Sequence, residues 1–196
     1  ADFAMVFIKS PVSNGYNKAD REAGGNGYVP ISLQLKDYTA TEARAQSIAA
    51  GDPVIDPTIT NRSYLNKTSK SNSYPDLNTI LDTKKAMNGK PVLVAITVSN
   101  PMVFAEFEKE VDAIVGEFGV QMEALLDIVS GKTEPSGLLP LQMPIDMTTV
   151  EKQLEDVPHD MIPYRDANGN VYDFGFGLNW KGTIKDARTE KYSVKK

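Results

Sequence analysis

The sequence contains no cysteine, one histidine and one tryptophan. Without cysteine, the chain can form no disulfide, thiolate metal site or cysteine nucleophile. A lone histidine, His159, with no second histidine or cysteine to accompany it makes a poor metal site. The sequence therefore predicts neither a metal ion nor another cofactor.

Long apolar runs and an excess of positive charge are also missing. The longest apolar run, Pro91 to Val98, is far too short to cross a bilayer, so no membrane insertion is expected. The net charge of −5 and the lack of a basic stripe argue against nucleic acid as a partner. With 196 residues, of which 41% are hydrophobic, the chain can bury the core of one soluble domain.

Apolar runs bounded by glycine and proline predict an α/β fold. Predicted strands lie at Phe3–Ile8, Val92–Val98, Asp112–Val115 and Leu138–Met143. Predicted helices lie at Thr41–Ala50, Asp76–Met87 and Gln121–Val129, with shorter helical segments at Phe104–Glu110 and Thr148–Leu154. Strand, helix and strand between Val111 and Pro144 form a βαβ pattern, which implies a parallel sheet. We therefore expect a three-layer sandwich with a mostly parallel sheet flanked by helices. A hairpin turn at Asn168-Gly169 could add an antiparallel edge strand.

Three segments of the chain resemble one known family in the family's order. Residues 134–140, EPSGLLP, with Met143-Pro144 after them, resemble the "NPSGRLP…P" segment of glycoside hydrolase family 3. Residues 172–178, YDFGFGL, resemble its "YPFGFGLSY" ending, and residues 1–8, ADFAMVFI, resemble its "AD-x-AIVVVG" strand. The resemblance covers residues 1–182 and concerns the C-terminal α/β sandwich of these enzymes. Residues 183–196 are expected to form a polar C-terminal tail.

The resemblance implies a part in a retaining, exo-acting β-glycosidase similar to β-glucosidases. Its substrate would be a β-linked glycoside or oligosaccharide. The family's nucleophile is an aspartate of a separate (β/α)8 barrel domain, and such a barrel needs about 250 residues. The chain is therefore expected to complete the sugar site of an N-terminal barrel that is absent here, and to be inactive alone.

The segment Lys9–Gly27, predicted as a loop after the first strand, is the main candidate for chemistry. In open α/β sheets, ligands bind beyond the carboxyl ends of the strands. The resemblance implies an acid/base carboxylate in this loop, and two alignments of the motif select Glu22 or, alternatively, Asp20. The other interpretation of these residues is that both are solvated loop charges without a catalytic role. Candidate sugar-binding residues are Arg21 and Asn26 in the same loop, together with Arg62 and Tyr64 in the polar segment Asp52–Tyr74.

Two other functions remain compatible with the sequence. One is a carbohydrate-binding or scaffold domain without catalysis, and the other is a flavodoxin-like ligand-binding module. An uncovered sheet edge or apolar face would need a partner chain, which a homo-oligomer could also supply. The sequence does not fix the compartment, and an extracellular or cell-surface location is slightly favoured over a cytoplasmic one.

Overall fold

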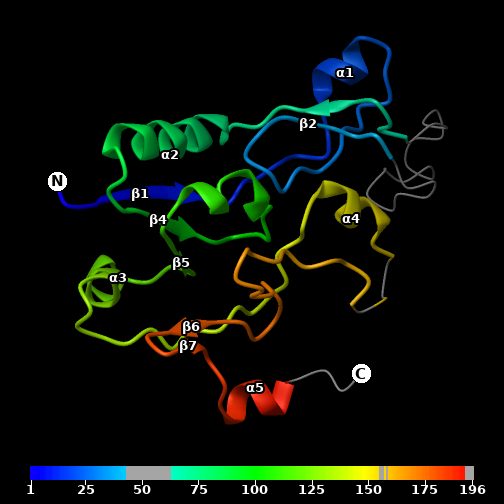
Figure 1. Cartoon of the computed structure of the whole chain (residues 1–196). Coiled ribbons are helices and arrows are strands. Elements are labelled where there is room, and N and C mark those ends of the chain that lie inside the picture. The colour runs from blue at the N-terminus through cyan, green and yellow to red at the C-terminus, as the bar shows by residue number, and fades with distance from the viewer. Residues whose placement is uncertain (43–62, 155–156, 158, 193–196) are drawn as a thin grey trace.

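The computed structural model describes residues 1–42, 63–154, 157 and 159–192. Its centre is a three-stranded parallel sheet in the order β1-β4-β5. The strands are β1 (Ala4–Lys9), β4 (Val92–Thr97) and β5 (Ala113–Glu117). Figure 1 shows their carboxyl ends pointing the same way, with helices on both sides of the sheet. The prediction of an α/β sandwich built on a mostly parallel sheet is confirmed.

Helix α2 (Tyr74–Met87) is the crossover between β1 and β4 and covers one face of the sheet. It begins earlier than the predicted Asp76 because Pro75 suits the first helical turn. It ends at Asn88, which has left-handed backbone geometry with φ 47°. Leu77 and Ile80, three residues apart, lie on the same side of the helix and are buried against the sheet.

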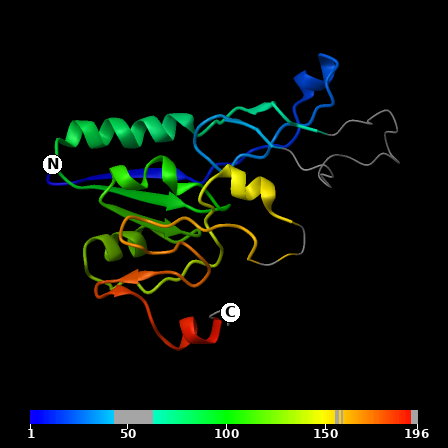
Figure 2. The same cartoon turned by 45° about the vertical axis from the view of Figure 1, so that its right-hand side comes forward.

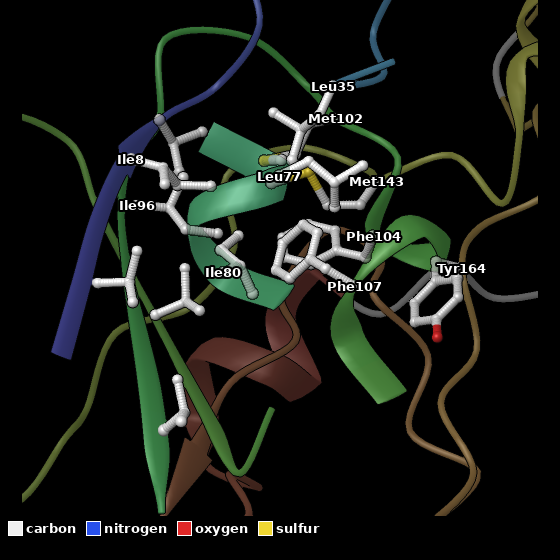
Figure 3. Packing of buried hydrophobic residues seen from close by; sticks show 14 residues of the cluster. Ile8, Leu35, Leu77, Ile80, Ile96, Met102, Phe104, Phe107, Met143 and Tyr164 are labelled. Atoms are coloured by element: carbon white, nitrogen blue, oxygen red, sulfur yellow. The ribbon is translucent and has the colours of Figure 1, made fainter. Parts of the chain in front are cut away.

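Alternation along the strands supplies the other half of this core. Successive strand residues point to opposite faces, so every second side chain meets α2. The buried strand residues of the cluster are Val6, Ile8, Val92, Val94 and Ile96. Figure 3 shows Ile8 and Ile96 beside Leu77 and Ile80.

Two short 3-10 helices, η1 (Phe104–Glu106) and η2 (Glu108–Glu110), extend the core away from the sheet. Phe104 and Phe107 are buried, with ring centroids 5.7 Å apart. Tyr164 stacks on Phe104 at 6.4 Å and donates a 2.8 Å hydrogen bond to Glu108. Burial raises the pKa of the Tyr164 phenol, so this contact keeps its proton at all physiological pH values.

The opposite face of the sheet is only partly covered. Helix α3 (Met122–Val129) lies on this side and buries Leu125. A shallow slot remains between the helix and the sheet, lined by Phe7, Ala95, Thr97, Glu117, Val120, Met122 and Leu125. Phe7 on the edge strand is 53% exposed, so a substantial apolar surface remains in contact with solvent.

The prediction of a strand at Leu138–Met143 is wrong. The segment is extended but does not join the parallel sheet. The backbone of Leu139 instead exchanges hydrogen bonds with Phe176 and Gly175, and Met143 bonds with Tyr172 and Tyr164. Pro140 within the segment and Pro144 directly after it lack the N–H donors that a central strand needs. The segment expected as the second strand of the predicted βαβ unit therefore does not pair with the parallel sheet.

Glycine permits the close packing of this region. A Cβ on Gly177 would lie 2.1 Å from the carbonyl oxygen of Gly137, which no side chain tolerates. Gly177 therefore allows the backbones of these two segments to approach closely.

The remaining elements are short. Antiparallel pairs form two separate small sheets, β2 (Tyr38–Thr39) with β3 (Thr68–Ser69) and β6 (Leu178–Asn179) with β7 (Gly182–Thr183), so neither extends the parallel sheet. The short helices are α1 (Lys18–Glu22), α4 (Met147–Lys152) and α5 (Ala187–Tyr192). The helix predicted at Thr41–Ala50 lies, beyond Glu42, outside the described residues. The predicted domain limits remain a prediction, although the segment expected as a tail contains α5.

The carboxylate of Glu106 joins η1 to the segment before β2, so its removal should weaken the fold. It accepts hydrogen bonds from the backbone N–H groups of Leu35 and Lys36, the latter at 3.0 Å. Burial raises the pKa of Glu106 despite these two hydrogen bonds. We expect Glu106→Ala to lower the free energy of unfolding by about 2 kcal/mol because two N–H groups lose their acceptor.

Urea unfolding of the chain measures this effect. Glu106→Gln retains one acceptor oxygen and should lose about half as much. Glu110→Ala, an exposed residue of η2, is the matched control. An unchanged urea midpoint in Glu106→Ala would contradict the assignment.

Candidate functional site

The segment that follows β1 projects beyond the carboxyl end of the sheet, as both views show (Figures 1 and 2). It was predicted as one long loop, but residues Lys18–Glu22 form the short helix α1. Asn17 starts this helix, because its side chain accepts hydrogen bonds from the N–H groups of Ala19 and Asp20. The candidate carboxylates therefore stand on a helix, whose geometry fixes their relative directions.

A short antiparallel contact closes the base of this projection. Tyr16 and Tyr28 form a backbone bridge, and their rings meet edge to face at 6.3 Å. Asn17 donates to Gly27 at 2.7 Å, and Val29 donates to Gly15 at 3.1 Å. Residues 15–29 therefore form a closed unit rather than a loose excursion.

Asp20 lies on the inner side of α1, at the centre of a polar network. Its Oδ2 accepts hydrogen bonds from Lys67 Nζ at 2.6 Å and from the Gly27 N–H at 2.7 Å. Lys67 Nζ also donates to Asn26 Oδ1 at 2.5 Å. The Asn26 amide in turn donates to the Ser63 carbonyl at 2.8 Å. The network joins α1 to the segment that precedes β3.

The network also explains the glycine sequence after the helix. A Cβ on Gly25 would lie 2.3 Å from the Asp20 carboxylate, so the chain packs directly on that group. Gly27 has φ +81°, a conformation that other residues rarely adopt, and a Cβ there would meet the Tyr16 ring. Both glycines are thus required by the position of Asp20 and Tyr16.

The surroundings of Asp20 favour its ionised form. The hydrogen bond from Lys67, followed by that from Gly27, holds the pKa of Asp20 below its ordinary value. A general acid needs the opposite shift. This geometry makes Asp20 an anchor for the turn and favours Glu22 between the two candidate acids.

Glu22 points the other way. Residues two apart on a helix lie about 200° around its axis, on nearly opposite sides. The Glu22 side chain is 65% exposed and pairs with Lys18 one turn earlier at 3.3 Å. Exposed pairs of this kind are weak, so the Glu22 carboxylate can exchange Lys18 for another partner.

The other candidate residues differ in whether they belong to this network. Arg21 is half-buried on α1, between the two carboxylates. Asn26 belongs to the network itself, and its Oδ1 also accepts the Tyr28 N–H at 3.0 Å. Arg62 lies outside the described residues.

Tyr64 belongs to a neighbouring cluster. Its hydroxyl donates to Glu151 of α4 at 2.5 Å, which connects the segment before β3 to that helix. Burial and the nearby Glu151 raise the pKa of Tyr38 to about 12, so this tyrosine remains neutral. Asn26 bonds to Ser63, the residue before Tyr64, so the structure brings Asn26 and Tyr64 to adjacent positions.

Two residues of this region were not identified from the sequence. Lys67 and Glu151 lie 47 and 87 residues from their partners Asp20 and Tyr64. Neither belongs to a local motif, and both are common surface residue types. No pattern in the sequence alone could have selected them.

Within the described ranges, no group of three histidine, cysteine or acidic residues is placed to hold a metal ion. Among the same residues, no helix has the length and apolar character needed to cross a bilayer. The region beyond β1 is a polar, amide-rich projection on an α/β sandwich.

Comparison with known families identifies the class of this sandwich. The family model described as the glycosyl hydrolase family 3 C-terminal domain matches residues 1–180. The chain therefore belongs to this family, and the resemblance seen in the three sequence segments is confirmed.

Several relatives of the chain carry β-glucosidase names. Probable beta-glucosidase C of Aspergillus flavus is 36% identical over 104 residues, which make up 50% of this chain and 16% of that protein. Beta-glucosidase C of Emericella nidulans is 34% identical over 104 residues, again 50% and 16% of the two chains. A periplasmic beta-glucosidase/beta-xylosidase of Dickeya chrysanthemi is 27% identical over 107 residues, or 55% and 15%. The match thus spans about a sixth of the relatives' length.

The network around Asp20 should persist in acid. A lowered pKa means that the ionised carboxylate contributes stability above the unfolded-state pKa of about 3.9, and that this contribution is lost as pH falls below it. We expect the amide of Gly27 to keep its protection against hydrogen exchange from pH 7 to about pH 4, and to lose it at lower pH.

Protection factors measured by NMR, which correct for the intrinsic pH dependence of exchange, test this expectation. Asp20→Asn should show low Gly27 protection at every pH. Loss of Gly27 protection near pH 6 in the unmodified chain would refute the assigned shift.

Proposed function

We propose that this chain completes the sugar site of a retaining, exo-acting β-glycosidase, with Glu22 as the acid/base carboxylate. The observation that carries the proposal is the placement of Glu22. It stands on the outer side of α1, beyond the carboxyl end of β1, on a projection anchored by Asp20. Family membership supplies the glycosidase context, and the names of the relatives supply the β-glucoside preference.

The partner would be an N-terminal barrel domain that carries the nucleophilic carboxylate. In a retaining reaction, Glu22 donates its proton to the glycosidic oxygen while the bond to the anomeric carbon breaks. The partner's carboxylate forms the new bond to that carbon. Glu22, now ionised, then takes a proton from the water that releases the sugar, which restores both groups.

This role requires a change in the surroundings of Glu22. A general acid needs a raised pKa, which comes from desolvation or from a second carboxylate nearby. Docking of the projection against a barrel would supply both, because the two carboxylates of a retaining site stand about 5–5.5 Å apart. The exposure of Glu22 in the separate chain is consistent with a group that awaits this contact.

Arg21, Asn26 and Tyr64 are proposed to contact or frame the sugar, together with Arg62. Guanidinium and amide N–H groups donate to sugar hydroxyls, and amide and phenol oxygens accept from them. Asn26 and Tyr64 are already bonded to Ser63 and Glu151, so they also hold the projection in shape. Asp20 remains the alternative acid, although its bond to Lys67 argues for an anchoring role.

A carbohydrate-binding or scaffold domain without catalysis is the second candidate. The engagement of Asn26 and Tyr64 in protein contacts favours it, because a purely structural projection would show the same bonds. A homo-oligomer stays a prediction, as does the absence of nucleic acid and membrane partners.

Removal of the proposed proton donor tests the catalytic role. In the full-length enzyme that carries this chain, Glu22→Gln should lower kcat/KM for an alkyl β-glucoside by a factor of about 10²–10⁴, the usual contribution of general acid–base catalysis. A dinitrophenyl β-glucoside, whose leaving group departs without a proton, should lose much less. Steady-state kinetics on both substrates measure the difference.

Glu123→Gln, an exposed carboxylate in the first turn of α3, is the matched control and should leave both rates unchanged. Equal, small effects of Glu22→Gln and Glu123→Gln would remove the catalytic role and favour the scaffold function.

The separate chain should have no glycosidase activity. It supplies one carboxylate of a reaction that needs two, so no covalent intermediate can form. We expect no turnover of aryl β-glucosides by the purified 196-residue chain at micromolar concentration. Turnover by this chain that Glu22→Gln abolishes would contradict the proposal.

A further inference from the structure

Lys67 connects α1 to the segment that precedes β3. It lies just before β3, and its side chain is 23% exposed. Its ammonium group contacts two separate points of the projection, Asp20 Oδ2 at 2.6 Å and Asn26 Oδ1 at 2.5 Å. Because the first point is on α1 and the second is on the turn after it, one side chain fixes both ends of that turn.

The backbone around Lys67 is itself held by the sheet β2-β3. Lys67 N donates to Tyr64 at 3.0 Å, and its carbonyl accepts from Ala40 at 3.1 Å. Ala40 is fully buried. Lys67 therefore reaches α1 from a fixed base, which a freely moving surface lysine could not provide.

Because Asp20 and Glu22 belong to the same helix, the anchoring of Asp20 also fixes the direction of the Glu22 side chain. Asp20 and Glu22 stand on opposite sides of α1. When Lys67 holds Asp20 inward, Glu22 must point outward. In contrast, the pair between Lys18 and Glu22 lies within α1 and cannot orient the helix.

We propose that Lys67 is a positioning residue that sets the direction of the Glu22 carboxylate through Asp20 and Asn26. The proposal rests on the proposed function of Glu22 as acid/base. Lys67 lies outside the projection and outside any recognised motif. Under this proposal, it controls how well the acid carboxylate is aligned with the glycosidic oxygen.

Leaving-group dependence separates this role from a general effect on folding. A misplaced acid slows substrates that need a proton, whereas loss of folded protein slows all substrates equally. In the full-length enzyme, Lys67→Met should lower kcat/KM for an alkyl β-glucoside by about 10- to 100-fold, as expected for a displacement near 1 Å. It should lower kcat/KM for a dinitrophenyl β-glucoside by less than about threefold, because no proton transfer is needed. Lys67→Arg, which keeps the charge, should recover part of the loss.

Lys70→Met is the matched control. Lys70 pairs with Asp37, which lies before β2 and not on α1, at 2.7 Å, and its side chain is 81% exposed. It should leave the rates on both substrates unchanged. Equal losses on the two substrates in Lys67→Met, or no loss on either, would overturn the positioning role.

Glu22→Gln distinguishes failure of this inference from failure of the proposed function. If Glu22→Gln shows the leaving-group effect and Lys67→Met does not, Glu22 is the acid and Lys67 does not position it. If neither variant shows the effect, the proposed function itself is wrong.

Hydrogen exchange on the separate chain gives a readout independent of catalysis. Lys67→Met should speed exchange of the Gly27 amide, whose acceptor Asp20 loses its partner, by about tenfold or more. If the Met variant does not fold, Lys67→Gln keeps a donor without the charge and serves in its place. Unchanged Gly27 exchange in a folded variant would also overturn the proposal.

Discussion

The ion pair between Lys67 and Asp20 is the interaction on which the candidate site depends. It joins two segments 47 residues apart and is short, at 2.6 Å, with both side chains about three-quarters buried. Such pairs are stable only when their remaining hydrogen-bonding positions are satisfied. Here Gly27 donates a further hydrogen bond to Asp20, and Asn26 accepts one from Lys67. The arrangement therefore behaves as one unit: Asp20 is held in its ionised form by Lys67 and Gly27, the glycines pack on it, and Glu22 is left on the outer side of α1.

The sheet determines where this unit stands. In a parallel sheet the carboxyl ends of all strands lie at the same end, and the segment after β1 leaves from that end. Helix α2 returns the chain to the end of the sheet where the strands begin. Its Leu77 and Ile80 pack against one face of the sheet. The projection is thus presented by a rigid support. The opposite face, with Phe7 half-exposed beside α3, is covered less completely than is usual for a parallel sheet.

Local patterns in the sequence were sufficient for the elements of the main core. Continuous apolar runs identified β1 and β4, and helical spacing of Leu77 and Ile80 identified α2. The strand expected at Leu138–Met143 failed because Pro140 and Pro144 remove donors, and its partners are residues 164–176 instead. Helix α1 was missed because five residues carry too little periodicity. Lys67 and Glu151 could not be found, since their roles come from contacts between distant segments that no local motif records.

The central claim is that Glu22 meets the substrate's glycosidic oxygen when the chain is joined to its barrel. The most direct measurement is a crystal structure of the full-length enzyme with an intact β-linked disaccharide bound, obtained with the barrel nucleophile inactivated. The account predicts a Glu22 carboxylate oxygen within about 2.6–3.2 Å of the glycosidic oxygen, with Asp20 still bonded to Lys67. A structure in which another carboxylate occupies that position, with Glu22 in solvent, would contradict it.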